Sequence, residues 1–349
     1  MQKTKPTVLL IWGGRGAERD VSKMSAEYLF TLLDQSVFEV IPIFITPEGN
    51  WLRCDGIAIP SEEKERREVF LAIKENRGAL ISDGEVIYID AAFPMLHGDF
   101  GEDGVVQGAL ENAKISYVGP DNYSGPVTMD KVYTKIIAES LGIPTARFTV
   151  GIDGTQLYSK SRALDRAEKM FGYPMFIKPA RLGSSVGASK AASREEAEIA
   201  YDKANAHSKK VLIEELVNIE KEAECAYFKV KNKEIITDLA EISCSFGFYD
   251  YEKKYLCADG AVAEAHTDAP PEIQKRVKEY TKLLAEYIDI GQLGRFDFFL
   301  TRDGRVVFNE INAIPGFTQS SLYPILISES GIAPKDAVSL MIEDVLTER

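Results

Sequence analysis

The strongest limit on the fold comes from the first third of the chain, where short apolar runs alternate with helix-like patterns. Val8–Trp12 and Val40–Ile45 are short continuous apolar runs typical of buried strands, and Val21–Leu33 has helical apolar spacing. Phe93–Leu96 and Glu102–Ala113 repeat the order of strand followed by helix. The alternation predicts a parallel α/β sheet with ligands at the carboxyl ends of its strands.

A second region follows a linker marked by Gly119-Pro120 and Gly125-Pro126. Beyond it we expect helices over Met129–Leu141, Ser161–Met170, Arg194–Ala204 and Glu272–Tyr287, and strands near Arg147–Val150, Met175–Lys178, Val211–Val217, Ala226–Val230 and Ile235–Leu239. With 349 residues, the chain fits three units better than two, and we place them at 1–127, 128–222 and 223–349. Cys244–Ala263 is polar, aromatic and aperiodic, which indicates a long functional loop.

Charge and composition exclude several classes of protein. The 41 Lys and Arg residues against 54 Asp and Glu give a net charge of −13, which repels nucleic-acid phosphates and anionic lipid. The four cysteines and three histidines form no zinc-type cluster. Val8–Trp12 is too short for a signal peptide, and no apolar run reaches the ~18 residues of a membrane helix. We therefore expect a cytoplasmic enzyme with no nucleic-acid or membrane partner.

The most informative local pattern is a hairpin between Gly294 and Ala313. Asp303-Gly304 fits a two-residue type I′ turn, which places Asp297 opposite Glu310 and Arg295 opposite Asn312 on one face. The other face would carry Phe296, Phe298, Leu300, Val307 and Ile311. Two carboxylates and an amide are oxygen donors suited to a hard cation such as Mg²⁺. A surface salt bridge of Arg295 with either carboxylate is the alternative.

Three further loops carry weaker signals. Lys178–Ala188 is rich in Gly and Ser and could bind phosphate or form a simple turn; it lacks the Walker A pattern. Trp12–Ser22 leads into a helix, and its Glu18 could interact with the helix dipole or bind a substrate ammonium. His97–Gly108 has acidic residues at a helix start and by itself resembles a helix cap.

Taken together and in order, the motifs resemble the D-alanine–D-alanine ligase family of the ATP-grasp superfamily. The matching blocks are GGRGAERDVS, HGDFGEDGVVQGALE, YVG…MDK, FIKPARLGSSVG, FYDYEKKY, GRFDFFL and FNEINAIPGFTQSSLYP, and they extend from Gly13 to Pro324. The resemblance implies an α/β three-domain ATP-grasp architecture with an N-terminal parallel α/β domain. It also implies ATP-dependent joining of two D-alanines through an acyl phosphate, as in peptidoglycan precursor synthesis.

The resemblance also implies roles for individual residues. ATP would be bound by Lys131, Lys178, Ser184, Ser185, Glu214, Leu216, Val217, Glu222, Lys254, Asn309 and Glu310. Two Mg²⁺ ions, or Mn²⁺ in their place, would be held by Asp297, Glu310 and Asn312. The amino-acid subsites would involve Glu18, His97, Glu102, Arg295, Gly316, Ser321 and Leu322. Arg295 and the Gly316 N–H would stabilise the oxyanion, and Tyr255, in a lid over 244–263, would close toward Glu18 and Ser184. A homodimer is expected on the same basis.

Some positions depart from the family pattern and some alternatives stay open. Gly16 and Ala313 stand where Ser or Thr is usual, and the segment around Glu222 has one extra residue, which leaves Glu220 and Glu224 as rivals for the ribose. The pair Lys254-Tyr255 resembles the D-alanine type, whereas D-serine or D-lactate as acceptor is the alternative within the family. Another ATP-grasp carboxylate–amine ligase and a nucleotide-binding regulatory module are the remaining rivals.

Overall fold

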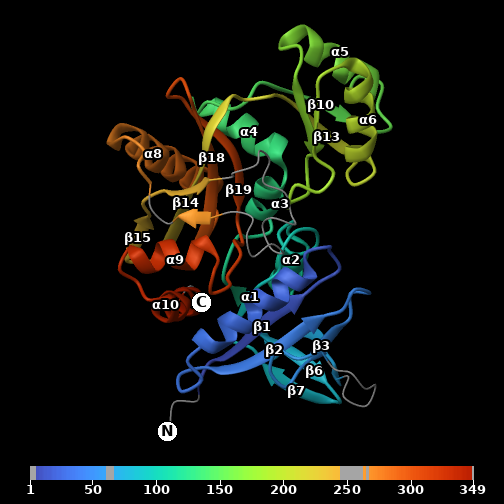
Figure 1. Ribbon diagram of the computed structural model, residues 1–349. Helices are drawn as coiled ribbons and strands as arrows, with labels where there is room; N and C mark the ends of the chain where they lie inside the picture. The colour runs from blue at the N-terminus through green and yellow to red at the C-terminus, as the bar shows by residue number, and fades with distance from the viewer. Residues whose placement is uncertain (1–4, 60–66, 244–261, 265–266, 348–349) are drawn as a thin grey trace.

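The N-terminal part of the molecule is a mostly parallel sheet, as the alternating pattern predicts. The computed structural model describes residues 5–59, 67–243, 262–264 and 267–347 (Figure 1). β1 (Thr7–Gly13) lies in the middle of the sheet and is parallel to both β2 (Glu39–Ile45) and β8 (Ala91–Pro94), and β9 (Ser116–Tyr117) is parallel to β8. α1 (Arg19–Leu32) packs against β1. The fold class predicted from the first third is confirmed.

Short antiparallel strands complete this part and were not predicted. β3 (Trp51–Arg53) and β4 (Arg67–Glu68) extend the sheet antiparallel at one edge. A separate three-stranded sheet follows, formed by β5 (Phe70–Lys74), β6 (Arg77–Ser82) and β7 (Glu85–Tyr88). These segments have mixed burial and no clear apolar alternation, so their sequence carries little strand signal. α2 (Val105–Asn112) then starts three residues later than expected.

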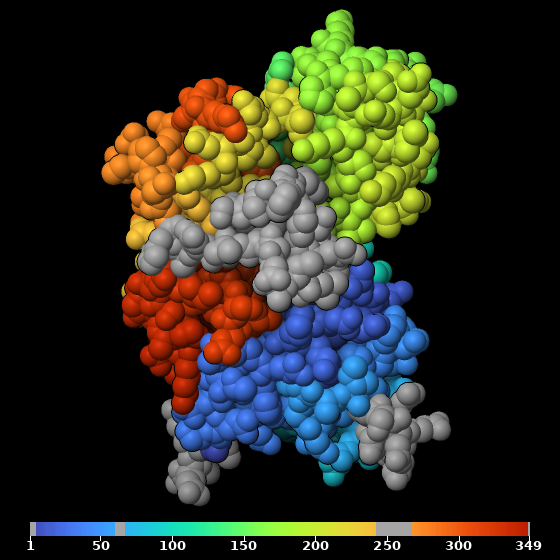
Figure 2. Space-filling view, in the orientation of Figure 1, coloured from blue at the N-terminus to red at the C-terminus, as the bar shows by residue number. Residues whose placement is uncertain are grey.

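The middle of the chain forms a four-stranded sheet with two helices packed on it. The strand order is β10-β13-β11-β12, and the strands are β10 (Phe148–Ile152), β11 (Met175–Pro179), β12 (Ser189–Ala191) and β13 (Lys210–Glu215). α5 (Lys160–Met170) and α6 (Arg194–Asn205) share one apolar cluster with strands β11 and β13. Figure 2 shows this part as a separate lobe (green) at the end of the molecule opposite the N-terminal lobe (blue).

The C-terminal part is a second large sheet with helices on both faces. Its strands are β14 (Ile219–Val230), β15 (Lys233–Ile236), β16 (Ala240–Ser243), β17 (Val262–Glu264), β18 (Leu293–Thr301) and β19 (Val306–Asn312). Residues of α4 (Lys131–Ser140) and α8 (Pro271–Ile288) pack on one face, and α3 (Ser124–Met129) precedes α4. α9 (Leu322–Glu329) and α10 (Pro334–Thr347) pack on the other face, in a cluster that includes β1 residues.

The remaining predicted elements are found, with shifted ends. The strand expected at Ala226–Val230 is the last part of β14, which begins at Ile219. Residues 244–261 of the expected loop 244–263 lie outside the described part, whereas Val262 and Ala263 belong to β17. The loop prediction was therefore wrong at its end, because these residues pair with β16.

The β18–β19 hairpin has the predicted pairs but not the predicted turn. Arg295 opposes Asn312 and Asp297 opposes Glu310, as expected. The turn is wider than a two-residue type I′ turn: the Thr301 N–H donates to the Arg305 carbonyl at 3.0 Å, and Gly304 alone in the turn has positive φ, at 78°. The loop therefore contains three residues, one more than predicted.

A β-bulge compensates for the longer turn. The register shifts between Asp297 and Phe298, so that Phe298 opposes Phe308 and Asn309 is the extra residue of β19. Below the bulge, the core face therefore carries Val306 and Phe308, and the prediction of Val307 on that face was wrong. Above the bulge, Glu310 and Asn312 keep the predicted face. The extra residue in the turn and the extra residue in the bulge offset each other, so the predicted pairing holds at the end of the hairpin that carries Glu310 and Asn312.

Candidate active site

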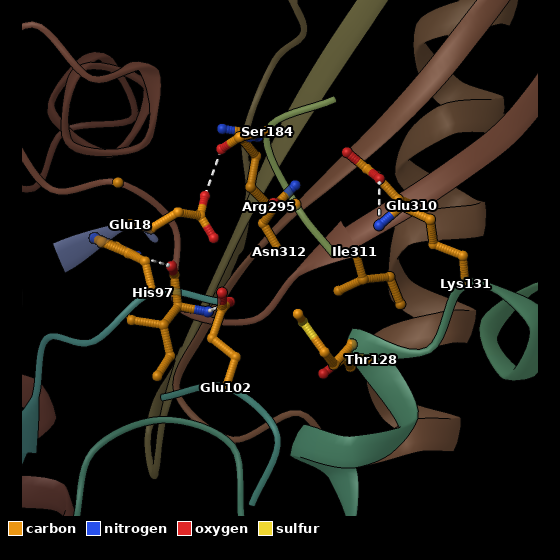
Figure 3. Close-up of a pocket in the computed structure, with 14 residues that line it drawn as sticks. Glu18, His97, Glu102, Thr128, Lys131, Ser184, Arg295, Glu310, Ile311 and Asn312 are labelled. Carbon is orange, nitrogen blue, oxygen red and sulfur yellow. Dashed lines mark hydrogen bonds and ion pairs between the residues drawn. The ribbon is translucent and has the colours of Figure 1, made fainter. Parts of the chain in front are cut away.

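Two adjoining cavities lie where the three sheets meet. The larger is a cleft of about 660 Å³ between the central sheet and the C-terminal sheet, lined by parts of β11, β13, β14, β18 and β19. The smaller pocket lies toward the N-terminal sheet and is drawn in Figure 3. Lys131, Gly183 and Glu310 line both cavities, so a ligand in the cleft would meet a ligand in the pocket at these residues.

Most residues predicted to bind a nucleotide line the larger cleft. They are Lys131, Lys178, Ser185, Glu214, Leu216, Val217, Glu222, Asn309 and Glu310. Ser184 lines the smaller pocket instead, and Lys254 lies outside the described residues. Glu220 and Glu224 line the cleft beside Glu222, so the choice among these three for the ribose stays a prediction. The cleft is both large and mixed in polarity, as a site for a base and a phosphate chain requires.

Two lysines on the cleft wall are placed by the ends of regular elements. Lys131 is the first residue of α4; its Nζ lies 3.1 Å from Glu310 Oε2 and donates to the Leu182 carbonyl at 2.9 Å. Lys178 lies near the end of β11, with its Nζ 2.8 Å from a Glu214 oxygen. Each ammonium is therefore held by a carboxylate and lies on the cleft wall, where it could meet phosphate.

Asp130, which sequence reasoning did not assign, positions the start of α4. Its carboxylate accepts the Val132 N–H at 3.1 Å as the helix N-cap. The same buried carboxylate is 2.8 Å from Arg181 Nε and 2.8 Å from Lys210 Nζ. It thus joins the helix that carries Lys131 to the central sheet and to the Gly/Ser loop. Its place immediately before Lys131 was the only signal in the sequence.

The hairpin face combines opposite charges. Arg295 contacts Asp297 through two bonds of 2.8 Å, and its Nε lies 2.9 Å from Glu224 on β14. Asn312 donates from Nδ2 to Asp297 at 3.1 Å. The salt bridge considered as an alternative is therefore present, but at a largely buried position beside a cavity rather than on the surface. Glu224 was missed as a partner of Arg295; it shares a face with Glu222 because side chains two residues apart in a strand do so.

The residues present fit a divalent cation. Asp297 and Glu310 are opposing carboxylates, and Asn312 lies beside them with an amide oxygen as a further donor. Within the described residues, no group of three or more His, Cys, Asp or Glu side chains is arranged to hold a metal alone. A cation at this position would therefore draw further oxygen ligands from outside the protein, such as phosphate, as Mg²⁺ commonly does.

Glu18 points into the smaller pocket. It precedes α1, and its side chain makes no capping hydrogen bond with that helix. Instead, the Ser184 hydroxyl donates to the Glu18 carboxylate across 166 residues of sequence (Figure 3). Gly98 has φ +67° and its Cα faces Glu18 so closely that a Cβ there would overlap the carboxylate. The side chain therefore faces the pocket and does not cap α1, and binding of a substrate ammonium by Glu18 stays a prediction.

His97 is held as a neutral ring by a defined chain of hydrogen bonds. Its Nδ1 lies 3.0 Å from the Ile314 carbonyl, so this nitrogen carries the proton, and its Nε2 accepts from the Ser25 hydroxyl at 3.1 Å. Ser25 in turn accepts the Phe317 N–H at 3.1 Å. Burial lowers the pKa of His97 to about 4, and Arg295 acts in the same direction. The ring thus ties α1 to the loop after β19.

Glu102 bonds to the same loop from the other side. Its two oxygens accept the Gly98 N–H at 2.8 Å and the Ile314 N–H at 3.1 Å. The carboxylate therefore spans two loops and does not cap α2. The cap expected from the acidic residues of this loop comes from Asp103, which accepts the Val105 N–H at the start of α2 at 3.2 Å. Burial, together with the negative charge of Glu18, raises the pKa of Glu102 to about 7.

The remaining predicted substrate residues follow β19. Gly316 lines the smaller pocket, whereas Ser321 precedes α9 and accepts the Thr318 N–H at 3.0 Å. Leu322 is buried in an apolar cluster with α10 residues and does not line either cavity. Tyr255 lies outside the described residues. Binding of a substrate by Ser321, Leu322 and Tyr255 stays a prediction.

Two facing sheets around a nucleotide-sized cleft, with a carboxylate-bearing hairpin at its inner end, define an enzyme of the ATP-grasp class. Solved structures agree: VanG D-Ala:D-Ser ligase from Enterococcus faecalis has a TM-score of 0.88 at 30% identity, covering 98% of this chain and 100% of that one. D-alanyl-alanine synthetase A from Vibrio cholerae has a TM-score of 0.85 at 28% identity, covering 99% of each chain.

Sequence comparison places the chain within one family. The family description "D-ala D-ala ligase N-terminus" matches residues 7–120, and "D-ala D-ala ligase C-terminus" matches residues 137–343. D-alanine–D-alanine ligase of Streptococcus thermophilus is 36% identical over 342 residues, covering 97% of this chain and 95% of the relative. That of Caldicellulosiruptor bescii is 37% identical over 348 residues, covering 97% and 94%. The chain belongs to the D-alanine–D-alanine ligase family.

No helix in the described part of the chain is both long and apolar enough to cross a membrane.

Proposed function

We propose that this protein joins two D-alanines into D-alanyl-D-alanine at the expense of ATP, through a D-alanyl phosphate, for peptidoglycan precursor synthesis. The observation that carries the proposal is the contact between the two cavities. The smaller one offers Glu18 and Arg295, the larger one offers lysines for phosphate, and Lys131 and Glu310 belong to both. Family membership supports the same reaction.

The first D-alanine binds in the smaller pocket. Its ammonium pairs with Glu18, whose orientation is held by Ser184, and its carboxylate faces the wall shared with the cleft. There a carboxylate oxygen attacks the γ-phosphorus of ATP, the bond to the β,γ-bridging oxygen breaks, and ADP leaves. Lys131 and Lys178 hold the phosphates, and Asp297, Glu310 and Asn312 hold the divalent cations. These cations, when bound, neutralise the charge that develops on the transferred phosphoryl group.

The second step forms the peptide bond. The amine of the second D-alanine attacks the acyl carbon to form a C–N bond, the tetrahedral intermediate collapses as the bond from the acyl carbon to the phosphate oxygen breaks, and the proton lost by the amine passes to the departing phosphate. Arg295 and the Gly316 N–H stabilise the oxyanion as preorganised donors, an effect that is often the largest in acyl transfer. His97 and Glu102 hold the loop that carries Gly316, through Ile314 and Phe317. Ser321 binds the second carboxylate. Lys254 and Tyr255 lie outside the described residues; Lys254 would add to the phosphate contacts and Tyr255 would help to exclude water.

The test of this function is phosphate release with ATP and Mg²⁺ in the presence of D-alanine, followed by mass analysis of the product. Release that depends on D-alanine and yields D-alanyl-D-alanine is the expected result. D-serine and D-lactate are offered with D-alanine in parallel reactions. No release with any of the three would contradict the proposed reaction and favour another ATP-grasp carboxylate–amine ligase, or a nucleotide-binding module without turnover.

D-serine as acceptor is a second candidate, and one observation favours it. The solved structure named VanG D-Ala:D-Ser ligase has a TM-score of 0.88 and covers 98% of this chain. The two acceptors differ by one hydroxyl group, so a pocket can favour either with small changes. Competition between D-alanine and D-serine, read as the ratio of the two dipeptides by mass spectrometry, decides which acceptor the site prefers.

The metal assignment has its own test. Glu310→Gln removes one carboxylate and should abolish turnover, because an amide binds Mg²⁺ far more weakly than a carboxylate does. Turnover is measured with Mg²⁺ and again with Mn²⁺, which we propose as a substitute ion. Asp303→Asn, at an exposed carboxylate in the turn of the same hairpin, serves as the control and should keep wild-type activity. Near-wild-type kcat in Glu310→Gln would overturn the assignment.

The proposal also covers the domain boundaries, the oligomeric state and the cellular location. We place the domains at 1–127, 128–222 and 223–349, supported by one main sheet in each, although β14 begins at Ile219, just before the last boundary. The homodimer expected from the family resemblance is tested by sedimentation equilibrium. Cytoplasmic location stays a prediction and is tested by fractionation of cells that produce the protein.

A further inference from the structure

Lys135 is a fully buried lysine to which sequence reasoning gave no role. It lies on α4 one turn after Lys131, and none of its side chain is exposed. Its Nζ is 2.6 Å from Glu214 Oε1, and Glu214 is at the end of β13 on the wall of the cleft. Removing an ammonium group from water is costly, so a buried lysine needs a partner of opposite charge.

The same carboxylate holds a second lysine. Glu214 Oε2 is 2.8 Å from Lys178 Nζ, which also donates to Asn309 Oδ1 at 3.2 Å. Lys178 and Asn309 line the cleft, whereas Lys135 does not. One carboxylate therefore lies between two ammonium groups, of which one reaches a ligand and the other is enclosed. We call Lys135, Glu214 and Lys178 the buried triad.

The charges of the triad are unequal. Two ammonium groups and one carboxylate leave one positive charge in excess. Lys135 has no exposed surface and cannot move to a ligand, so it neutralises Glu214 in every state of the site. Lys178 is then the surplus charge and can turn from Glu214 to a phosphate without leaving a buried carboxylate unpaired.

We propose that Lys135 is a positioning residue that keeps Glu214 neutralised, so that Lys178 is available to bind the phosphates of the nucleotide. Without Lys135, Glu214 and Lys178 form a balanced pair, and phosphate must break a partly buried ion pair to bind the lysine. This inference rests on the proposed function only in taking the cleft as the nucleotide site.

The groups of the triad shift one another's pKa values. Burial raises the pKa of Glu214, but Lys135 and Lys178 outweigh that effect and hold the pKa below its ordinary value. Burial lowers the pKa of Lys135, and the charge of Lys178 acts in the same direction, while Glu214 opposes both. Lys135 and Glu214 therefore depend on each other for their charges.

The experiment compares ADP with adenosine, which differ only in the phosphates, by isothermal titration calorimetry without metal ion. Lys135→Met keeps the length of the side chain and removes its charge. The variant should bind ADP at least about tenfold more weakly than wild type does, while its affinity for adenosine changes less than about threefold. An equal loss for both ligands, or no loss for ADP, would overturn the proposal.

A second variant separates charge from packing. In Lys135→Met/Glu214→Gln the carboxylate is neutral as well, so Lys178 again carries the single positive charge. The ratio of ADP to adenosine affinity should return toward the wild-type value, although Glu214 itself lies on the cleft wall. A double variant with the same low ratio as Lys135→Met would contradict a role through the charge of Glu214.

Control variants distinguish an effect of the triad charges from a general loss of stability. Ala138→Gly, one turn further along α4 in an uncharged apolar cluster, weakens the helix without touching the triad charges and should leave the ratio unchanged. If Lys135→Met does not fold, the same comparison is made with Lys135→Gln against the double variant. Wild-type protein that binds neither ADP nor adenosine would refute the nucleotide site itself, an outcome distinct from failure of the Lys135 proposal.

Discussion

Individual residues in the smaller pocket are oriented by hydrogen bonds whose donors and acceptors are all determined. His97 donates to the Ile314 carbonyl and accepts from Ser25, which accepts the Phe317 N–H. A neutral imidazole with its proton on Nδ1 fits this chain with the Ser25 hydroxyl as donor to Nε2. His97 and Ser25 thus connect the loop around Gly316 to α1.

The lowered pKa of His97 predicts that the stability of the folded protein depends on pH. Its pKa is lowered from 6.5 to about 4 in the folded protein, so between these values the unfolded chain binds more protons. Stability is therefore lost as pH falls from 6.5 to 4, by roughly 3 kcal/mol from this residue. His97→Gln should lack this contribution, so its thermal unfolding curves should approach or pass those of wild type at low pH. Parallel pH profiles for the two proteins would contradict the assignment.

Removal of the Arg295 side chain should slow the reaction with little effect on ATP binding. Arg295 is held by Asp297 and Glu224 and lines the pocket, which supports the proposed role of an oxyanion donor. Arg295→Ala should lower kcat by about 10²–10³ with little change in the KM for ATP. Arg305→Ala, at an exposed site in the same hairpin, is the control. A raised KM for D-alanine with unchanged kcat would assign Arg295 to substrate binding instead.

At the scale of elements, α4 carries Lys131, which lines the cleft, and Lys135, which contacts Glu214. The first turn of this helix is held by Asp130. This carboxylate is both the N-cap and the partner of Arg181 and Lys210. Asp130→Ala should destabilise the protein by about 3–4 kcal/mol, because it removes the cap and leaves the buried Lys210 without its carboxylate. Asp130→Asn keeps a cap acceptor and should lie between this variant and wild type. Chemical denaturation measures all three.

The control for this series is a helix with an ordinary cap. Ser193 caps α6 by accepting the Glu196 N–H and has no ion pair. Ser193→Ala should cost about 1 kcal/mol. If Asp130→Ala costs no more than Ser193→Ala does, the ion pairs of Asp130 contribute nothing to stability and the argument fails.

In the β18–β19 hairpin, local sequence patterns predicted the facing pairs but not the turn. Alternation along β18 and β19 predicted which residues of the hairpin share the functional face, and these pairs are confirmed. The turn was wrong by one residue and the bulge at Asn309 was not predicted, because Asp303-Gly304 is compatible with more than one turn type. The two errors act in opposite directions, so the prediction held only at the end of the hairpin where they cancel.

At the scale of the whole molecule, the N-terminal and C-terminal parts are joined by close backbone contact. Gly291 has φ +79°, and a Cβ on it would overlap the Gly119 carbonyl oxygen. The next residue, Gln292, accepts the Gly119 N–H at 3.1 Å. The linker after the first sheet is thereby fixed to the strand that leads to Arg295.

Gly291 and Gly304 provide a matched pair of substitutions. Both have positive φ, but a Cβ on Gly304 would meet nothing within 4 Å. Gly304→Ala should cost about 1–2 kcal/mol from backbone strain alone. Gly291→Ala should cost a further 1–3 kcal/mol or so, because the linker must move away from the strand. Equal shifts in Tm for the two variants would show that the contact with Gly119 adds nothing.

The amino-acid sequence alone determined the features that depend on neighbours along the chain. These are the parallel α/β start, the longer helices before β18, many of the strands, and the common face of Arg295, Asp297, Glu310 and Asn312, because periodicity and alternation are local properties. The order of the motifs was also sufficient to indicate the family.

Only the tertiary structure decided which distant charges meet. Glu224 on β14 contacts Arg295 on the adjacent strand β18, Lys135 contacts Glu214 from a helix, and Ser184 contacts Glu18 from the loop after β11. A charged residue has the same appearance in a sequence whether it is solvated or buried, and its partner is selected by packing between segments. The buried triad therefore could not be predicted, since it results from how the central sheet and α4 come together.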